Sequence, residues 1–188
     1  MSDKYKLTDK TMEASSIKLF RIRALRSFGD VKAGDLGGWV GGVKNLSQDG
    51  DSWVFGNARV YGNARVYGDA QVFCDAQVYG DAKVYGDAQV FGDAQVYGDA
   101  QVFGDAWVSG NAQVYSDAQV YGDAWVYDDA RVYDDAKVYG NTGVYGDAQV
   151  FGNARVSGNA RVYGNAGVLG NARVFDNAPG TPMLPEQS

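Results

Sequence analysis

The sequence predicts an all-β protein built as a triangular, single-stranded parallel β-helix, and three observations lead to this prediction. Valine occupies every sixth position from Val54 to Val174, 21 times without a substitution. A small residue precedes each valine by two positions, and it is alanine except at Ser52 and Thr142. Glycine followed by Asp or Asn precedes most of these alanines, and such residues tolerate the positive φ of a sharp corner.

A short strand and a two-residue corner, repeated without a slip in register, wrap into a coil whose strands stack on those of the next coil. Three six-residue sides make one turn of 18 residues, so the 21 hexads predict about 7 regular coils. Residues two apart in a strand share a face, so Ala and Val point into the prism while the residue between them and the aromatic residue after Val point outward. Each buried valine contributes roughly 1.5 to 3 kcal/mol of hydrophobic free energy.

The chain divides into three parts by its periodicity. Residues 1–40 have no hexads and are predicted to form an N-terminal β cap, since a solenoid must cover its raw strand edges. Residues 41–178 are predicted to form the β-helix, with an imperfect first coil because Leu46 and Val54 lie eight positions apart. Residues 179–188 have three prolines and no period, which predicts a loose tail.

Two strands are expected in the cap, over residues 5–7 and 17–25, because apolar and polar residues alternate there. The second strand region also carries a basic set. Its members are Lys18, Arg21, Arg23 and Arg26.

The outward positions form rows with distinct chemistry, and we predict that they include an interaction surface. The tryptophans of the central rod and the tyrosine beside them are Trp107, Trp125 and Tyr127. The predicted tyrosine ladder is Tyr61, Tyr79, Tyr97, Tyr115 and Tyr133. The basic strip is Arg65, Lys83, Lys137, Arg155 and Arg173. The alternative is purely structural: long side chains cover the aromatic rows and pair with corner aspartates, and the ladders set the strand register.

The corners carry two predicted acidic rows, one of Asp81, Asp99, Asp117 and Asp135 and the other of Asp69, Asp87, Asp105 and Asp123. One carboxylate per coil is a poor cage for calcium, so we expect no metal site. The acidic edges could instead engage a nucleic-acid-binding partner by mimicry. The net charge of −6 disfavours direct nucleic-acid binding.

The A-x-V hexads, over about 125 residues, resemble the hexapeptide repeat of left-handed β-helix proteins. The opening KLTDKTMEASSIKLFRIRALRSFGDVKAGDLGGWV resembles the N-terminal segment of hexapeptide-repeat proteins of bacteria and prophages, whose function is generally unassigned. The resemblance implies a left-handed coil. One departure is that Tyr or Phe follows the valine where that family often has glycine. Ordinary crossovers are right-handed, so a right-handed, bactofilin-like filament module stays open.

The best-known members of the hexapeptide family are acyltransferases with a histidine base, and carbonic anhydrases on this fold bind zinc through histidines. This chain has no histidine, and its unbroken register leaves no loop for a catalytic excursion. Cys74 has no activating neighbour in the sequence. We therefore predict no catalytic residue, no cofactor and no enzymatic activity.

The leading functional hypothesis is a non-catalytic rod of bacterial, phage or prophage origin that presents its rows to a protein partner, to itself or to a glycan. Alternatives are an acyltransferase-like protein without the usual histidine, a phage factor that sequesters a host protein through the acidic edges, and the filament module. With one cysteine, no secretory signal visible and no apolar run long enough to span a bilayer, the expected location is cytoplasmic and no membrane contact is expected.

Overall fold

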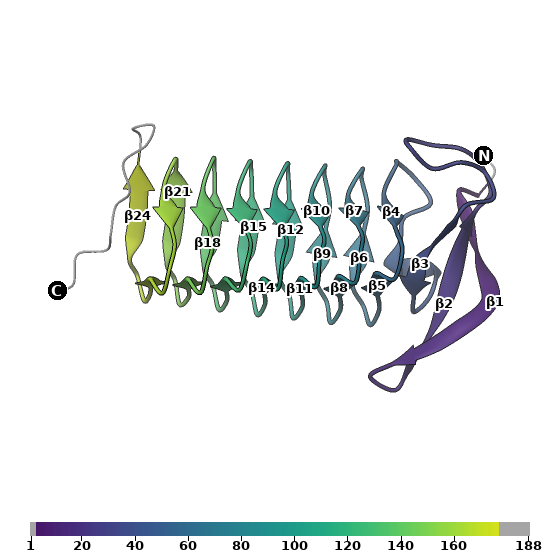
Figure 1. Ribbon diagram of the computed structural model, residues 1–188, viewed down its shortest axis with the longest axis horizontal. Coiled ribbons are helices and arrows are strands. Elements are labelled where there is room, and N and C mark those ends of the chain that lie inside the picture. The colour runs from purple at the N-terminus through teal and green to yellow at the C-terminus, as the bar shows by residue number, and fades with distance from the viewer. Residues whose placement is uncertain (1–2, 177–188) are drawn as a thin grey trace.

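The computed structural model describes residues 3–176 and shows a rod of stacked coils with a β-hairpin at its N-terminal end (Figure 1). Three parallel sheets run along the rod, so the predicted all-β solenoid with three strands per turn is confirmed. It has about eight turns, one irregular and the rest regular. The left hand of the coil stays an expectation from the resemblance.

From β4 on, each sheet takes every third strand of the chain, and β1 to β3 extend sheet 1. Sheet 1 contains β1 (Tyr5–Ala14), β2 (Ile17–Ala24), β3 (Leu36–Val40), β5 (Arg59–Val60), β8 (Gln77–Val78), β11 (Gln95–Val96), β14 (Gln113–Val114), β17 (Arg131–Val132), β20 (Gln149–Val150) and β23 (Gly167–Val168). Sheet 2 contains β4 (Trp53–Val54), β7 (Gln71–Val72), β10 (Gln89–Val90), β13 (Trp107–Val108), β16 (Trp125–Val126), β19 (Gly143–Val144) and β22 (Arg161–Val162). Sheet 3 contains β6 (Arg65–Val66), β9 (Lys83–Val84), β12 (Gln101–Phe103), β15 (Gln119–Tyr121), β18 (Lys137–Tyr139), β21 (Arg155–Gly158) and β24 (Arg173–Asp176).

The core is the predicted prism of valine and alanine. The repeat valines from Val54 to Val150 are essentially inaccessible to solvent, and each lies opposite the valine 18 residues away. Exposure rises only in the last coils, to 8% at Val174. The inward assignment of Ala and Val is therefore confirmed, and the outward positions are free to vary.

The corners adopt the left-handed backbone that the Gly-Asp and Gly-Asn pairs predict. Corner glycines such as Gly86 have φ near 70°, and an added Cβ there would lie 2.9 Å from the backbone of the next corner. Cys74, Asp128 and Asp134 occupy the same position with φ of 62°, 59° and 57°. Asp128 and Asp134 each accept a hydrogen bond from the N–H of the next corner glycine, which ties adjacent coils together.

The first coil is irregular, as the eight-residue step predicts. Val40 of β3 pairs with Val60, and Leu46 forms an isolated bridge to Val66. The 3-10 helix η1 (Val43–Asn45) lies between them, and the Asn45 amide donates hydrogen bonds to the carbonyls of Gly62 and Ala64. Stacking thus begins at β3, inside the residues predicted as the cap.

The cap is a longer hairpin than predicted. The first strand extends to Ala14 rather than ending near residue 7, because it pairs antiparallel with β2 across an irregularity between Leu7 and Thr11. Ser15 and Ser16 form the turn with φ of 49° and 63°. Serine is an uncommon residue in such a turn, which explains why the sequence did not reveal the hairpin. The predicted tail at residues 179–188 lies outside the described residues.

The end of the rod is closed by aromatic and lysine contacts from the cap. Trp53 is 1% exposed, and its ring meets Tyr5 and Phe28 edge to face at 6.1 and 5.3 Å. Lys4 is buried, and its Nζ donates to the carbonyls of residues 49, 50 and 52 and to the Ser52 hydroxyl. Burial lowers the pKa of Lys4 to about 8.

Candidate interaction surfaces

Three ring columns run along the outside of the rod, one beside each sheet. Column 1 consists of Tyr61, Tyr79, Tyr97, Tyr115, Tyr133 and Phe151. Column 2 consists of Phe55, Phe73 and Phe91, and then, after an interruption, Tyr127, Tyr145 and Tyr163. Column 3 consists of Tyr67, Tyr85, Phe103, Tyr121 and Tyr139. Column 1 contains the whole predicted tyrosine ladder.

Most neighbouring rings within a column stack nearly parallel, although Phe55 meets Phe73 edge to face, and the stacking decides what the columns offer to a partner. Neighbouring centroids in column 1 lie 4.9 to 5.2 Å apart with interplanar angles of 1° to 4°. This spacing is close to the separation of about 4.8 Å between neighbouring strands. Since the faces cover one another, the column presents ring edges and hydroxyl groups. A glycan usually packs on an open ring face, so the interior of a column is a poor glycan platform.

Glutamines lock the tyrosine columns to the strands. The hydroxyl of Tyr79 donates to Oε1 of Gln95, which lies 16 residues later in the next coil, at 3.2 Å. Tyr85 and Gln101 form the same bond at 3.3 Å. The outward glutamines therefore have a structural role, in line with the structural alternative above.

Desolvation within the columns raises the pKa values of several tyrosines, Tyr79 and Tyr115 among them. Burial is the largest cause at Tyr79, where the neighbouring rings Tyr97 and Tyr61 add to it and the pKa rises to about 12. The pKa of Tyr115 is raised for the same reasons. These hydroxyl groups are thus held protonated as hydrogen-bond donors.

The tryptophan pair lies where column 2 is interrupted. Ser109 occupies the ring position of that coil, and the ring of Phe91 meets Trp107 edge to face at 6.1 Å instead. Trp107 stacks on Trp125 at 5.7 Å, and the two are 41% and 49% exposed. Trp107 and Trp125, with the half-buried Tyr127 in the same strand region as Trp125, form what we call the tryptophan patch.

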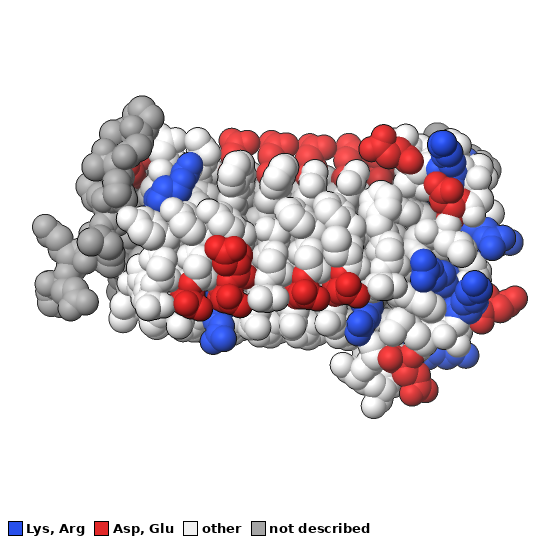
Figure 2. Space-filling model, viewed as in Figure 1, with Lys and Arg blue, Asp and Glu red and all other residues white. Residues whose placement is uncertain are grey.

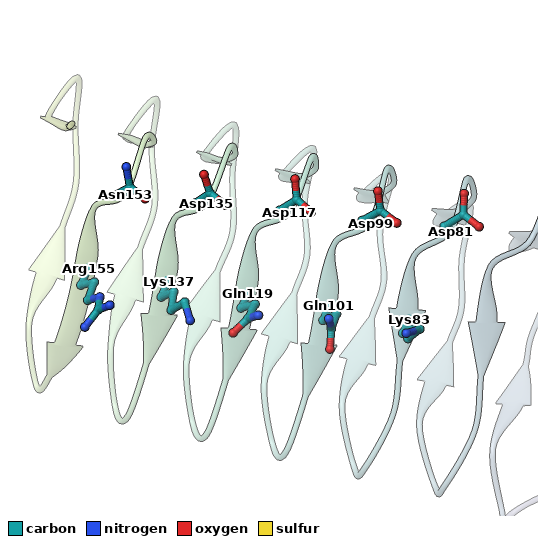
Figure 3. A pocket seen from close by; sticks show the side chains of 10 residues that line it. All are labelled: Asp81, Lys83, Asp99, Gln101, Asp117, Gln119, Asp135, Lys137, Asn153 and Arg155. Atoms are coloured by element: carbon teal, nitrogen blue, oxygen red, sulfur yellow. The ribbon is translucent and has the colours of Figure 1, made fainter. Parts of the chain in front are cut away.

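The acidic rows follow the corners of the prism. Figure 2 shows red carboxylates aligned along the edges of the rod, whereas the blue cations gather mainly at its N-terminal end. The row of Asp81, Asp99, Asp117 and Asp135 borders an open trough of about 550 Å³. Figure 3 shows this row on one corner and Lys83, Lys137 and Arg155 on the adjacent strands of sheet 3. The second predicted row, Asp69, Asp87, Asp105 and Asp123, is exposed at another corner.

The basic strip is split between the two ends of sheet 3. Arg65 and Lys83 lie on adjacent paired strands near the cap, and Lys137, Arg155 and Arg173 lie on paired strands toward the C-terminal end. Gln101 and Gln119 separate the two groups. The strip is therefore two short cationic segments rather than one continuous surface.

The hairpin covers the start of column 1, which sequence reasoning missed. Tyr61 is only 5% exposed, because it packs in a cluster with Leu19 and Ala14 of the hairpin. Met12, Trp39 and Tyr79 border this cluster. Tyr61 is accordingly corrected from a candidate surface residue to a buried contact. A usable signal was Leu19, an apolar residue beside Lys18 in β2 that is fully buried.

The basic residues of the cap are partly engaged with rings. The Arg21 guanidinium lies 5.1 Å from the Trp39 ring centroid, and the Arg26 guanidinium lies 5.8 Å from that of Phe28. Lys18 lies over Phe20 at 5.4 Å. The Arg21 contact links β2 to β3, which stacks on the rod, whereas the other two contacts lie within the cap.

Residues 3–176 also bear on metal binding and on membrane crossing. Within that range no three His, Cys, Asp or Glu side chains converge to hold a metal ion. Nor does that range contain a helix of the length and apolarity needed to cross a membrane. Cys74 is an exposed free thiol at a corner.

The comparisons with known proteins agree with the coil geometry. A family model described as the YdcK beta solenoid repeat matches eight segments: residues 54–68, 58–72, 76–92, 94–110, 100–116, 118–134, 148–164 and 154–170. Together these segments cover more than half of the chain. The search of the curated proteins found no match. Because the matched segments span the regular coils from β4 to β23, the chain belongs to the YdcK beta solenoid repeat family.

Proposed function

We propose that this protein is a non-catalytic scaffold, a rigid rod that binds a protein partner through its outer surface. The observation that carries the proposal is the tryptophan patch. The equivalent positions in the preceding coils of sheet 2 are Gln71 and Gln89, which are half-buried and satisfy the fold without an indole. Two exposed tryptophans on successive coils thus serve no evident folding need, and exposed aromatic clusters commonly mark binding surfaces.

The rigidity of the rod supports the same role. Successive coils are joined by backbone hydrogen bonds on all three sides, for example Gln89 N–H to the Ala106 carbonyl at 2.9 Å. Outward side chains therefore keep fixed spacing, and a partner meets a preorganised surface that loses little conformational entropy on binding. The chain has no histidine, and no coil between Val54 and Val174 carries an inserted loop, which supports a role without catalysis.

A capture experiment tests the proposal. The intact chain on beads is incubated with lysate of the source cell, beside a Trp107→Gln, Trp125→Gln double variant that copies the natural glutamines of this row. We expect at least one protein, identified by mass spectrometry, to be retained by the parent and lost from the variant. A Tyr97→Phe, Tyr115→Phe variant is the control, since phenylalanine occurs naturally in the columns. If the parent and the tryptophan variant retain the same proteins, the proposal is wrong.

Two measurements address the competing functions. Light scattering across a concentration series reports self-association, which would support an assembly module such as a filament. A thermal shift with coenzyme A reports acyltransferase-like binding. An increase in melting temperature with coenzyme A that survives the tryptophan substitutions would contradict the non-catalytic assignment.

A further inference from the structure

The three ring columns differ at their N-terminal ends, and one of them begins with an open ring. Column 1 begins at Tyr61 beneath the hairpin, and Phe55 of column 2 packs against the main core cluster next to the buried Trp53. Column 3 begins at Tyr67, which is 36% exposed and stacks on Tyr85 at 4.8 Å. Within residues 3–176 no other ring contacts Tyr67.

The irregular first coil explains the open ring. Leu46 takes the place of the repeat valine opposite Val66, so Ser47 follows it at the position where later coils carry an aromatic residue. The Ser47 N–H still donates to the Val66 carbonyl at 2.9 Å, which keeps this edge of sheet 3 closed. The backbone is therefore stacked while the ring that would continue column 3 is missing.

A groove of about 640 Å³ lies at this position. Tyr67 lines it together with the exposed Val43 and the buried Leu46, and three cations, Lys44, Arg65 and Lys83, complete its charged border. The residues that line the groove include no carboxylate. This contrasts with the trough along the acidic row, where four aspartates lie along one side of the opening and Lys83, Lys137 and Arg155 lie along the other.

One of the two corners that flank residues 65–67 also lacks an aspartate, whereas Asp69 occupies the other. Asn63 occupies the position that precedes Asp81 in the acidic row, and its Oδ1 accepts a hydrogen bond from the Lys44 Nζ at 2.8 Å. The acidic row thus ends at Asp81, in the hexad of Lys83, and does not continue beside Arg65. In a chain of net charge −6, this leaves a local cationic surface next to an aromatic ring.

We propose that the groove binds a partner segment that carries an aromatic side chain flanked by carboxylates. The aromatic ring stacks on Tyr67 and so continues column 3, at the spacing of about 4.8 Å that neighbouring strands impose. The carboxylates pair with Lys44, Arg65 and Lys83. The groove is open to solvent along the surface, which suits one side of an extended peptide. This inference rests on the proposed scaffold function and names the partner chemistry that one of its surfaces takes.

Short capped peptides test the chemistry directly. Acetyl-Glu-Trp-Glu-amide is titrated into the intact chain and followed by peptide-observed NMR line broadening, beside Gln-Trp-Gln and Glu-Ala-Glu peptides with the same caps. We expect the first peptide to bind at least about fivefold more tightly than either control, equivalent to about 1 kcal/mol. Equal binding of all three peptides overturns the proposal. The absence of detectable binding of the first peptide at about 5 mM also overturns it, since a dissociation constant of about 5 mM corresponds to a binding free energy of roughly 3 kcal/mol.

Matched variants locate the binding. Tyr67→Ser is compatible with the fold, because Ser109 and Ser157 occupy equivalent positions, and its control is Tyr163→Ser at the far end of column 2. The Arg65→Gln, Lys83→Gln double variant copies Gln101 and Gln119, and its control is Lys137→Gln, Arg155→Gln on the same sheet. We expect each groove variant to weaken binding at least about fivefold and each control to change it less than twofold. Equal losses in variants and controls overturn the proposal.

The capture experiment separates this inference from the scaffold function. If a captured protein is retained by Tyr67→Ser but lost from the tryptophan variant, the scaffold function stands and the groove inference is wrong. Loss of a captured protein from both Tyr67→Ser and the tryptophan variant, with retention by Tyr163→Ser, supports both proposals.

Discussion

The regular coils and the N-terminal end of this molecule use the same side-chain types for different purposes. Inside column 1 of the regular coils, rings such as Tyr97 are covered by tyrosine rings on both sides, and each outward residue has a counterpart 18 residues away. At the N-terminal end the columns terminate against the hairpin, against the main core cluster or in an open groove. Repetition makes the rod rigid but chemically uniform, so distinct chemistry arises where the repetition is interrupted, at Ser109 and at Ser47.

The largest expected effect on stability comes from a substitution in the core of the rod. Val108 is inaccessible to solvent, and a Val108→Asp variant would place a carboxylate with no partner among stacked valines. We expect the variant to lose cooperative folding, since an unpaired buried charge costs several kcal/mol. Circular dichroism during thermal denaturation measures this, with Asn111→Asp at an exposed corner as the control. A variant that melts like the parent would refute the inward assignment.

The second prediction compares two tryptophans of the same sheet. Trp53 is 1% exposed under the cap, whereas Trp125 is 49% exposed on the rod. Trp53→Ala should destabilise the protein by about 3 to 5 kcal/mol, and Trp125→Ala by less than about 1 kcal/mol. Urea denaturation gives both values, and hydrogen exchange of β1 and β2 shows whether the cap opens first. Equal destabilisation by the two variants would mean that the cap does not depend on Trp53.

The smallest expected effect concerns alkaline pH. The pKa of Tyr79 is raised to about 12 in the folded chain, so the folded state keeps protons that the unfolded state loses near pH 10. Stability from the columns is therefore complete below pH 10 and falls as the pH rises toward 12. The contribution of Lys4 to stability instead rises with pH between 8 and 10.5. Its pKa of about 8 in the folded state lies below the unfolded value of 10.5, so the unfolded state holds the proton more tightly.

The measurement is the melting temperature between pH 9 and 12, with tyrosinate absorbance recorded in parallel. A melting temperature that is constant or rises between pH 10.5 and 12 would contradict the raised tyrosine pKa values. Tyr97→Phe removes one titrating ring from the middle of column 1 and should reduce the loss.

Much of the rod could be predicted from the sequence because each hexad repeats the same pattern of inward, outward and corner residues. The inward valines, the corner backbone and the stacking of Tyr79 on Tyr97 all follow from a period of six and three sides per turn. The cap was predicted less well. The strand that ends at Ala14 was expected to end near residue 7, since serine turns lack the usual turn residues.

The candidate surfaces were predicted only in part, because the covering of an outward residue depends on segments that lie far from it in the sequence. The exposure of Trp107 and Trp125 agrees with their outward positions. The covering of Tyr61 depends on the hairpin, which lies more than 40 residues earlier in the chain. The groove at Tyr67 depends on which residue of the irregular first coil lies opposite Val66, and the spacing alone did not single out Ser47.

The sequence by itself determined on which side of its strand each residue lies and which residues stack in columns, because both follow from local periodicity. Only the tertiary structure decided which outward residues remain accessible. Accessibility depends on segments distant in the chain that pack over a position. The hairpin packs over Tyr61, whereas among the described residues Tyr85 is the one ring that stacks on Tyr67.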